Sequence, residues 1–149
     1  MVYAWKHPIG IDAQKVGEHF EQLEQQHGRI TTSLVLESAR PEDSLLHSYF
    51  EWNDGIAAEK YRKNQANQII TCLVTVIEGT EKPEPVRAVV SIIKDKKREF
   101  RTINTVLHNE EYMEQLLRTA KRELLAFQKK YSVLSELADV FAVIDTLVE

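Results

Sequence analysis

The stretch from Gly28 to Gln68 constrains the fold more than any other part of this chain. It contains one helix stop and several short helix starts, and a segment rich in β-branched residues, Thr71 to Ile77, follows at once. Helices and strands thus come in separate blocks, which is typical of an α+β fold. The order is also compatible with a helix-turn-helix that passes into a β wing, a winged-helix-like arrangement.

Capping residues predict the bounds of the first helices. A helix from Ala13 to His27 is expected because Asp12 suits its N-cap and Gly28 its C-terminal stop. Thr31 or Thr32 starts a second, short helix, and the next proline ends it. The residues before the first helix, Met1 to Gly10, are expected to form an arm that packs on the body or on a neighbour.

Two more helices are predicted before the β-rich segment. One runs from Asp43 to Phe50, after a proline that suits a first helical position. Asn53 or Asp54 caps a longer helix from about Gly55 into the region of Ile70. This helix is expected to bury Ile56, Ala57, Tyr61 and Ile69 and to expose Arg62, Lys63, Asn64, Asn67 and Gln68.

A three-stranded antiparallel meander is predicted in the middle of the chain. Thr71 to Ile77 and Val86 to Ile93 are β-branched runs separated by a glycine and two prolines, and Phe100 to Leu107 alternates as a third strand. The turn from Lys94 to Glu99 is the only concentrated basic segment. The expected core consists of Phe20, Leu36, Phe50, Trp52 and Tyr61 in the helical part, and of Ile70, Val74, Val76, Val89, Ile92 and Ile103 in the sheet.

The C-terminal forty residues are predicted to be helical. Asn109 is a good N-cap, neither glycine nor proline follows it, and a break is expected near Tyr131 and Ser132. Apolar residues recur at spacings of three and four, close to a heptad seam. This seam belongs either to a helical hairpin that covers the sheet or to a coiled coil that joins two copies. The residues expected at such a dimer interface are Leu117, Leu124, Phe127, Tyr131, Leu134 and Phe141.

Length and charge limit the classes of function. The chain has 149 residues, of which 43% are hydrophobic, and this is enough for one compact body made of a helical part, residues 1–68, and a β-meander with C-terminal helices, residues 69–149. Its net charge is −4, so any binding to nucleic acid must depend on a local basic patch. No long apolar run indicates a membrane segment, and we expect a cytoplasmic protein in a bacterial host cell.

Catalytic and metal-binding patterns are missing from the sequence. The five histidines are scattered, the five glycines form no phosphate loop, and Cys72 is the sole cysteine, which excludes an intrachain disulfide and a multi-thiolate zinc site. Ser44 and His47 are neighbours on a predicted helix, which does not direct a hydroxyl at an imidazole beside an oxyanion hole. We therefore expect no enzyme activity, no metal and no cofactor.

Two segments carry the residue types that bind duplex DNA. The helix that begins near Gly55 presents donors and acceptors of the kind that contact base edges, and the basic turn would be the wing tip that contacts phosphates. The candidate DNA-binding residues are Arg62, Lys63, Asn64, Asn67 and Gln68 on the helix, and Lys94, Lys96, Lys97, Arg98 and Arg101 on the wing.

A pattern between Ala39 and Gln65 resembles one found in small proteins of bacteriophages and prophages to which no activity is assigned. It consists of Arg40-Pro41-Glu42-Asp43-Ser44, then Phe50-Glu51-Trp52-Asn53-Asp54, then Ala57-Ala58-Glu59, Tyr61 and Arg62. The resemblance implies a phage context. Two functions are expected from it and from the residues: a non-enzymatic DNA-binding protein, or an interaction factor that binds a host or phage protein. In either case the chain is expected to form a homo-oligomer.

Overall fold

The computed structural model of this chain describes residues 1–79, 81 and 84–148, without the side chains of Ile56 and Ala57. Their predicted burial therefore lies outside the described residues. The fold is α+β, as the sequence predicts. The chain forms two compact units, Met1–Thr105 and Val106–Glu149.

The first two helices begin and end where their caps predict. In α1 (Ala13–His27) the carboxylate of Asp12 accepts a hydrogen bond from the backbone of Lys15 at 3.1 Å. Gly28 has the left-handed φ of 69° and closes the helix with a bond to Glu24. In α2 (Thr32–Ala39) the hydroxyl of Thr31 caps the backbone of Leu34 at 3.1 Å. Both predicted helices are confirmed. Their bounds could be predicted because a capping bond lies within a single helical turn.

The predicted helix from Asp43 to Phe50 is wrong. Only one 3-10 turn forms there, η1 (His47–Tyr49). Successive bonds to the carbonyl three residues back, from His47 to Ser44 and from Phe50 to His47, replace the α-helical pattern. The longer helix does form, as α3 (Ile56–Cys72), but Gly55 is its N-cap. Asp54 does not cap it, because its carboxylate binds Arg62 at 3.1 Å.

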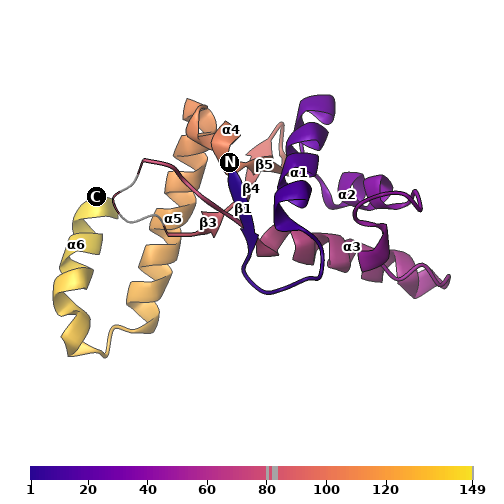
Figure 1. Cartoon of the computed structure of the whole chain (residues 1–149). Coiled ribbons are helices and arrows are strands. Elements are labelled where there is room, and N and C mark those ends of the chain that lie inside the picture. The colour runs from indigo at the N-terminus through magenta and orange to yellow at the C-terminus, as the bar shows by residue number, and fades with distance from the viewer. Residues whose placement is uncertain (80, 82–83, 149) are drawn as a thin grey trace. The chain divides into compact units, whose positions relative to one another are not determined.

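The N-terminal segment is a strand and not an arm. β1 (Val2–Trp5) pairs antiparallel with β2 (Leu73–Val76), and β2 pairs with β3 (Val86–Arg87), which gives a three-stranded sheet with β2 in the middle. Figure 1 shows β1 beside α1, and α3 passing below them. The predicted loop after β2 includes residues 80, 82 and 83, which lie outside the described part of the chain.

The predicted strand from Val86 to Ile93 is split between two sheets. Ala88 is buried at the break, where its N–H donates to Leu73 at 3.0 Å and its carbonyl accepts from Ile103 at 2.8 Å. Beyond it, β4 (Val89–Lys94) forms a hairpin with β5 (Lys97–Thr102). The turn has only two residues, Asp95 and Lys96, with φ of 51° and 63°, as expected for a type I′ turn. The predicted turn from Lys94 to Glu99 is therefore too long.

The predicted third strand ends early. Residues Ile103–Leu107 form a short helix, α4, so their assignment to a strand is wrong. The reason lies at Thr102, whose backbone N–H donates to the carboxylate of Glu24 at 2.6 Å and is lost to strand pairing. The hydroxyls of Thr102 and Thr105 bind the same carboxylate. A contact with α1 thus turns the chain from strand to helix.

The N-terminal unit contains the hydrophobic core. Phe20, Leu36 and Phe50 are buried as predicted, while Trp52 is half-buried against the core. Tyr61 is 55% exposed, so its predicted burial is wrong. Of the six residues expected in the sheet core, five are buried and Val76 is half-buried.

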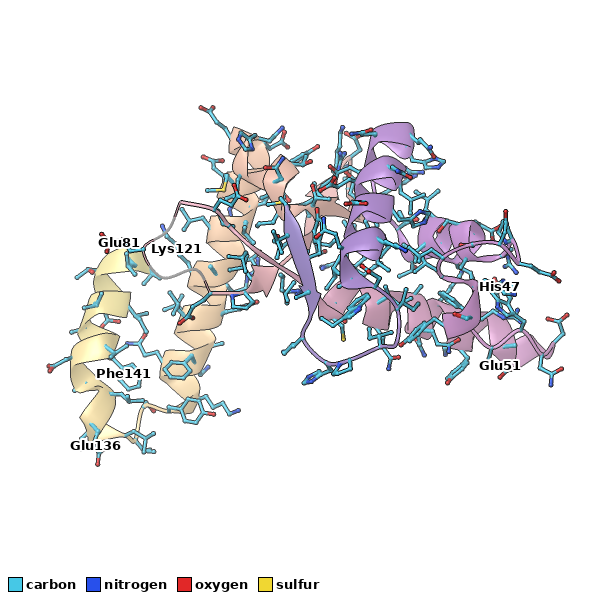
Figure 2. The ribbon with its side chains drawn as sticks, in the orientation of Figure 1. His47, Glu51, Glu81, Lys121, Glu136 and Phe141 are labelled. Carbon is cyan, nitrogen blue, oxygen red and sulfur yellow. The ribbon has the colours of Figure 1, made fainter. Side chains whose placement is uncertain are left out.

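The C-terminal unit contains a helical hairpin. α5 (Glu110–Lys130) begins at Asn109, whose side chain caps Tyr112 at 3.0 Å, and it ends at Tyr131, where the break was predicted. A 3-10 turn, η2 (Ser135–Leu137), leads into α6 (Ala138–Val148). Figure 2 shows Phe141 between α6 and α5, and its ring lies 6.3 Å from that of Phe127. We call α5, η2 and α6 the C-terminal hairpin.

Candidate functional site

A cluster around Trp52 joins the segment after α2 to the start of α3. The indole of Trp52 stacks on His47 with ring centres 4.8 Å apart, and its N–H donates to the carbonyl of His47 at 2.8 Å. The guanidinium of Arg62 lies 5.1 Å from the indole ring centre and that of Arg40 lies 5.9 Å from it. Both are within the range of cation–π attraction.

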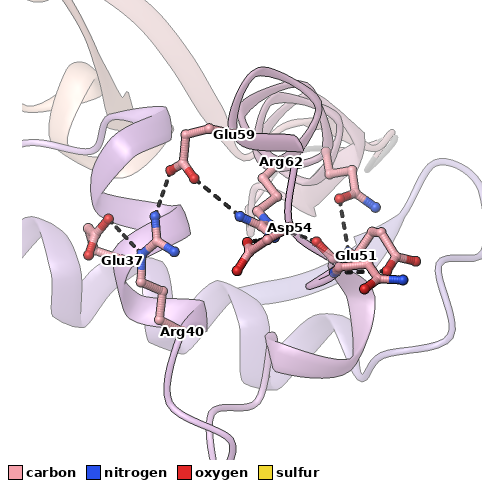
Figure 3. A network of polar contacts seen from close by, with 8 residues as sticks. Glu37, Arg40, Glu51, Asp54, Glu59 and Arg62 are labelled. Carbon is pink, nitrogen blue, oxygen red and sulfur yellow. Dashed lines mark hydrogen bonds and ion pairs between the residues drawn. The ribbon is translucent and has the colours of Figure 1, made fainter. Parts of the chain in front are cut away.

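Carboxylates surround the two arginines of this cluster (Figure 3). Arg62 binds Asp54 at 3.1 Å and Glu59 at 3.3 Å, and its Nε donates to the carbonyl of Glu51 at 2.7 Å. Arg40 binds Glu37 at 2.9 Å and Glu59 at 2.6 Å. The hydrogen bond to Glu37 is the main cause that raises the pKa of Arg40. The network thus joins six residues of the phage-like pattern: Arg40, Glu51, Trp52, Asp54, Glu59 and Arg62.

The predicted exposure of Arg62 is wrong. This residue is only 4% exposed and its charge is matched inside the cluster, so it does not belong to the exposed side of α3. Sequence reasoning missed the cluster, although the Arg40, Trp52 and Arg62 positions of the phage-like pattern were a signal for it. Helical periodicity predicts an exposed polar face, but it does not show where the polar groups of the preceding segment, here the Asp54 carboxylate and the Glu51 carbonyl, will lie.

The remaining polar residues of α3 lie exposed on its outer side. We define the α3 face as Lys60, Tyr61, Lys63, Asn64, Asn67 and Gln68. Gln68 also accepts a hydrogen bond from the hydroxyl of Tyr49 at 3.2 Å. The α3 face carries two positive charges, and no carboxylate occurs in the sequence between Lys60 and Cys72. Four of the five predicted residues of this helix, Lys63, Asn64, Asn67 and Gln68, therefore share one exposed face.

The basic hairpin tip is also exposed, with one exception. Lys94, Lys96, Lys97 and Arg98 lie at the surface, and Arg98 donates to the hydroxyl of Ser91 at 3.0 Å. Arg101 is buried and binds Glu99 at 2.9 Å, so its predicted exposure on the wing is wrong. Figure 1 shows the β4–β5 hairpin beside the upper part of α1 and α3 below it. The two basic surfaces therefore do not adjoin as a reading helix and its wing would.

The C-terminal hairpin exposes many apolar side chains. Four of the six predicted interface residues, Leu117, Leu124, Phe127 and Leu134, are exposed, while Tyr131 and Phe141 are half-buried. Phe127 contacts the rings of both Tyr131 and Phe141, and Ile144 is buried in the hairpin. On α6 a second stripe is exposed, formed by Val140, Val143 and Leu147. The two helices thus bury only part of their apolar surface against each other.

The part of the chain that the structure describes contains neither a metal-binding cluster nor a membrane-spanning helix. No group of three or more His, Cys, Asp or Glu side chains there is arranged to hold a metal ion. Among the described helices, none is both long enough and apolar enough to cross a membrane.

Comparison of the chain with protein-family models, with curated proteins and with solved structures gives no match.

Proposed function

We propose that this chain is a non-enzymatic DNA-binding protein of a phage or prophage, and that the α3 face contacts the DNA. The observation that carries the proposal is the composition of this face, which combines two lysines with amide side chains. Lysines bind phosphates, and asparagine and glutamine match the donor and acceptor pattern of adenine in the major groove. A single exposed helix is the element that enters this groove in many DNA-binding proteins.

The Trp52 cluster makes this face more favourable for DNA than the sequence suggests. Glu51, Asp54 and Glu59 precede the α3 face and would repel phosphates if they were unpaired. Arg62 pairs with the carboxylates of Asp54 and Glu59, and Arg40 binds Glu59 as well, while the carboxylate of Glu51 accepts a hydrogen bond from the backbone of Asn53. The charges of Lys60 and Lys63 are therefore less opposed by their neighbours, although the whole chain has a net charge of −4.

The test is a titration of duplex DNA with the wild type and with a Lys60→Gln, Lys63→Gln variant, measured by fluorescence anisotropy between about 50 and 200 mM salt. If both lysines contact phosphates, the variant binds more weakly and the slope of log affinity against log salt falls by about 1.8, at about 0.9 per contact.

The matched control is Lys6→Gln, Lys15→Gln, which removes the same charge from exposed positions of the same unit. Equal losses in the control and in the α3 variant would show only a general charge effect. Absence of binding at low salt would refute the DNA-binding proposal.

A second candidate function, binding of a host or phage protein, is favoured by the apolar side chains on the C-terminal hairpin. Clusters of exposed apolar residues commonly mark protein-binding sites. The test is a pull-down from infected cells after nuclease treatment, with Val140→Ser, Val143→Ser as the comparison. A protein captured by the wild type and lost with this variant supports the second candidate, and equal recovery by both refutes binding through α6.

A further inference from the structure

One side of α5 carries an acidic and a basic residue around an apolar one. Its charges are therefore complementary to those of the same side of an antiparallel α5. Glu114, Leu117 and Lys121 follow one another at spacings of three and four, so they lie on the same side of the helix. Together with Arg118 they line one hollow in the surface. Leu117 is 54% exposed, and the Glu114 side chain is 76% exposed. An apolar residue is thus flanked by an acid towards the helix N-terminus and by a base towards its C-terminus.

We propose that this side of α5 binds a second copy of the chain, with the two α5 helices antiparallel. A two-fold axis near Leu117 brings the leucines of both copies together. It also places Glu114 of each copy beside Lys121 of the other. Because the axis repeats every contact, a dimer forms two equivalent ion pairs around one apolar centre.

The distribution of charge along the whole helix favours the antiparallel direction. Three glutamates, Glu110, Glu111 and Glu114, lie in its first five residues. Five of the six charged residues from Arg118 onward are basic. A parallel copy would place like charges side by side, whereas an antiparallel copy places the acidic end of one helix against the basic part of the other. The α6 stripe adds apolar surface to the same hairpin but is not needed for the charge argument.

The experiment measures the molar mass of the full chain by light scattering over a roughly hundredfold dilution range. We expect a mass of twice 17.2 kDa at high concentration, which falls on dilution. Glu114→Lys and Lys121→Glu should each weaken the dimer by about tenfold, because each change converts two attractive pairs to repulsive ones.

The variant that carries both changes decides the arrangement. Double reversal restores opposite charges only if Glu114 faces Lys121 of another copy, so its dimer constant should return to near the wild-type value. Glu123→Lys, the same substitution at another exposed position of α5, should leave the dimer unchanged. Circular dichroism checks that all variants keep their helix content.

Three results would overturn the proposal. The first is a mass fixed at 17.2 kDa throughout, which would show that no second copy binds. The second is a dimer that neither single variant weakens, and the third is a double variant as weak as the single ones. None of these results depends on DNA, so the dimer and the DNA-binding function are tested separately.

Discussion

At the scale of single residues, Gly17 shows how one missing side chain lets two elements approach. It lies inside α1, where glycine costs about 1 kcal/mol relative to alanine. A methyl group here would overlap Cγ, Cδ2 and Cε2 of the Tyr3 ring, which is buried and whose hydroxyl donates to Glu21. Glycine is therefore required for contact between β1 and α1 and not for any special backbone angle.

Gly17→Ala should lower the free energy of unfolding by about 2 kcal/mol, because overpacking outweighs the gain in helix propensity. Urea titration followed by tryptophan fluorescence measures the change. Gly55→Ala is the matched control, since a methyl group at Gly55 meets no atom within 4 Å. An unfolding free energy that rises in Gly17→Ala would contradict the packing argument.

His19 is the residue that should link stability to pH. Burial lowers its pKa below the ordinary value of 6.5. Its Nε2 lies 3.0 Å from the hydroxyl of Ser38, which donates to the carbonyl of Val35, so the imidazole must be the donor. The unfolded chain thus binds a proton at His19 more readily than the folded chain does.

The contribution of His19 to stability should be complete above about pH 6.5 and should decline as the pH falls towards its lowered pKa. Urea titrations between about pH 7.5 and 5.5 measure it. In His19→Gln the loss of unfolding free energy over this interval should be smaller than in the wild type. The same loss in both proteins would assign the pH dependence to other groups.

At the scale of elements, the Trp52 cluster ties the connection between α2 and α3 to the start of α3. The segment contains one 3-10 turn and a few backbone bonds between residues three apart, and side-chain contacts add to these. Arg62 is central, since it binds the chain before α3 at Glu51 and Asp54 and also lies against Trp52. The cluster thus positions α3 and, with it, the α3 face.

Arg62→Met should lower the unfolding free energy by about 2 kcal/mol, because the Glu51 carbonyl loses a charged donor and the carboxylates lose their counter-ion. Part of this cost is reduced by solvent, since Asp54 is exposed. Lys63 is exposed, so Lys63→Met should change the unfolding free energy by less than about 0.5 kcal/mol. Chemical denaturation of both variants tests the difference, and equal effects would contradict the internal role of Arg62.

At the scale of the whole molecule, the two units differ in how they are stabilised. The main core cluster, from Tyr3 to Val89, lies entirely in the N-terminal unit. The C-terminal hairpin leaves much of its apolar surface exposed. Both tryptophans, Trp5 and Trp52, belong to the N-terminal unit, so their fluorescence follows its unfolding alone.

A fragment of residues 1–109 should therefore fold without the C-terminal hairpin. We expect a single cooperative urea transition in tryptophan fluorescence, because this fragment keeps the whole core cluster and α4. It should also be monomeric if α5 forms the dimer. A broad, non-cooperative transition would show that the core depends on the hairpin.

The sequence alone determined the features that arise within a few residues. Asp12, Gly28, Thr31 and Asn109 cap or end their helices as predicted, because a cap needs only its own turn. The exposure of Lys63 and its neighbours on α3 was predicted for the same reason, since helical periodicity is local. The break at Tyr131 was likewise found from the local pattern.

Only the tertiary structure decided the features that need a partner far along the chain. β1 is a strand because β2 supplies its hydrogen bonds, and Ile103 begins a helix because Glu24 in α1 takes the N–H of Thr102. Arg62 is buried because two groups from the chain before α3, the carboxylate of Asp54 and the carbonyl of Glu51, bind it there. The burial of a long charged side chain depends on where its counter-ions lie in the folded chain. Helical periodicity in the sequence does not predict those positions.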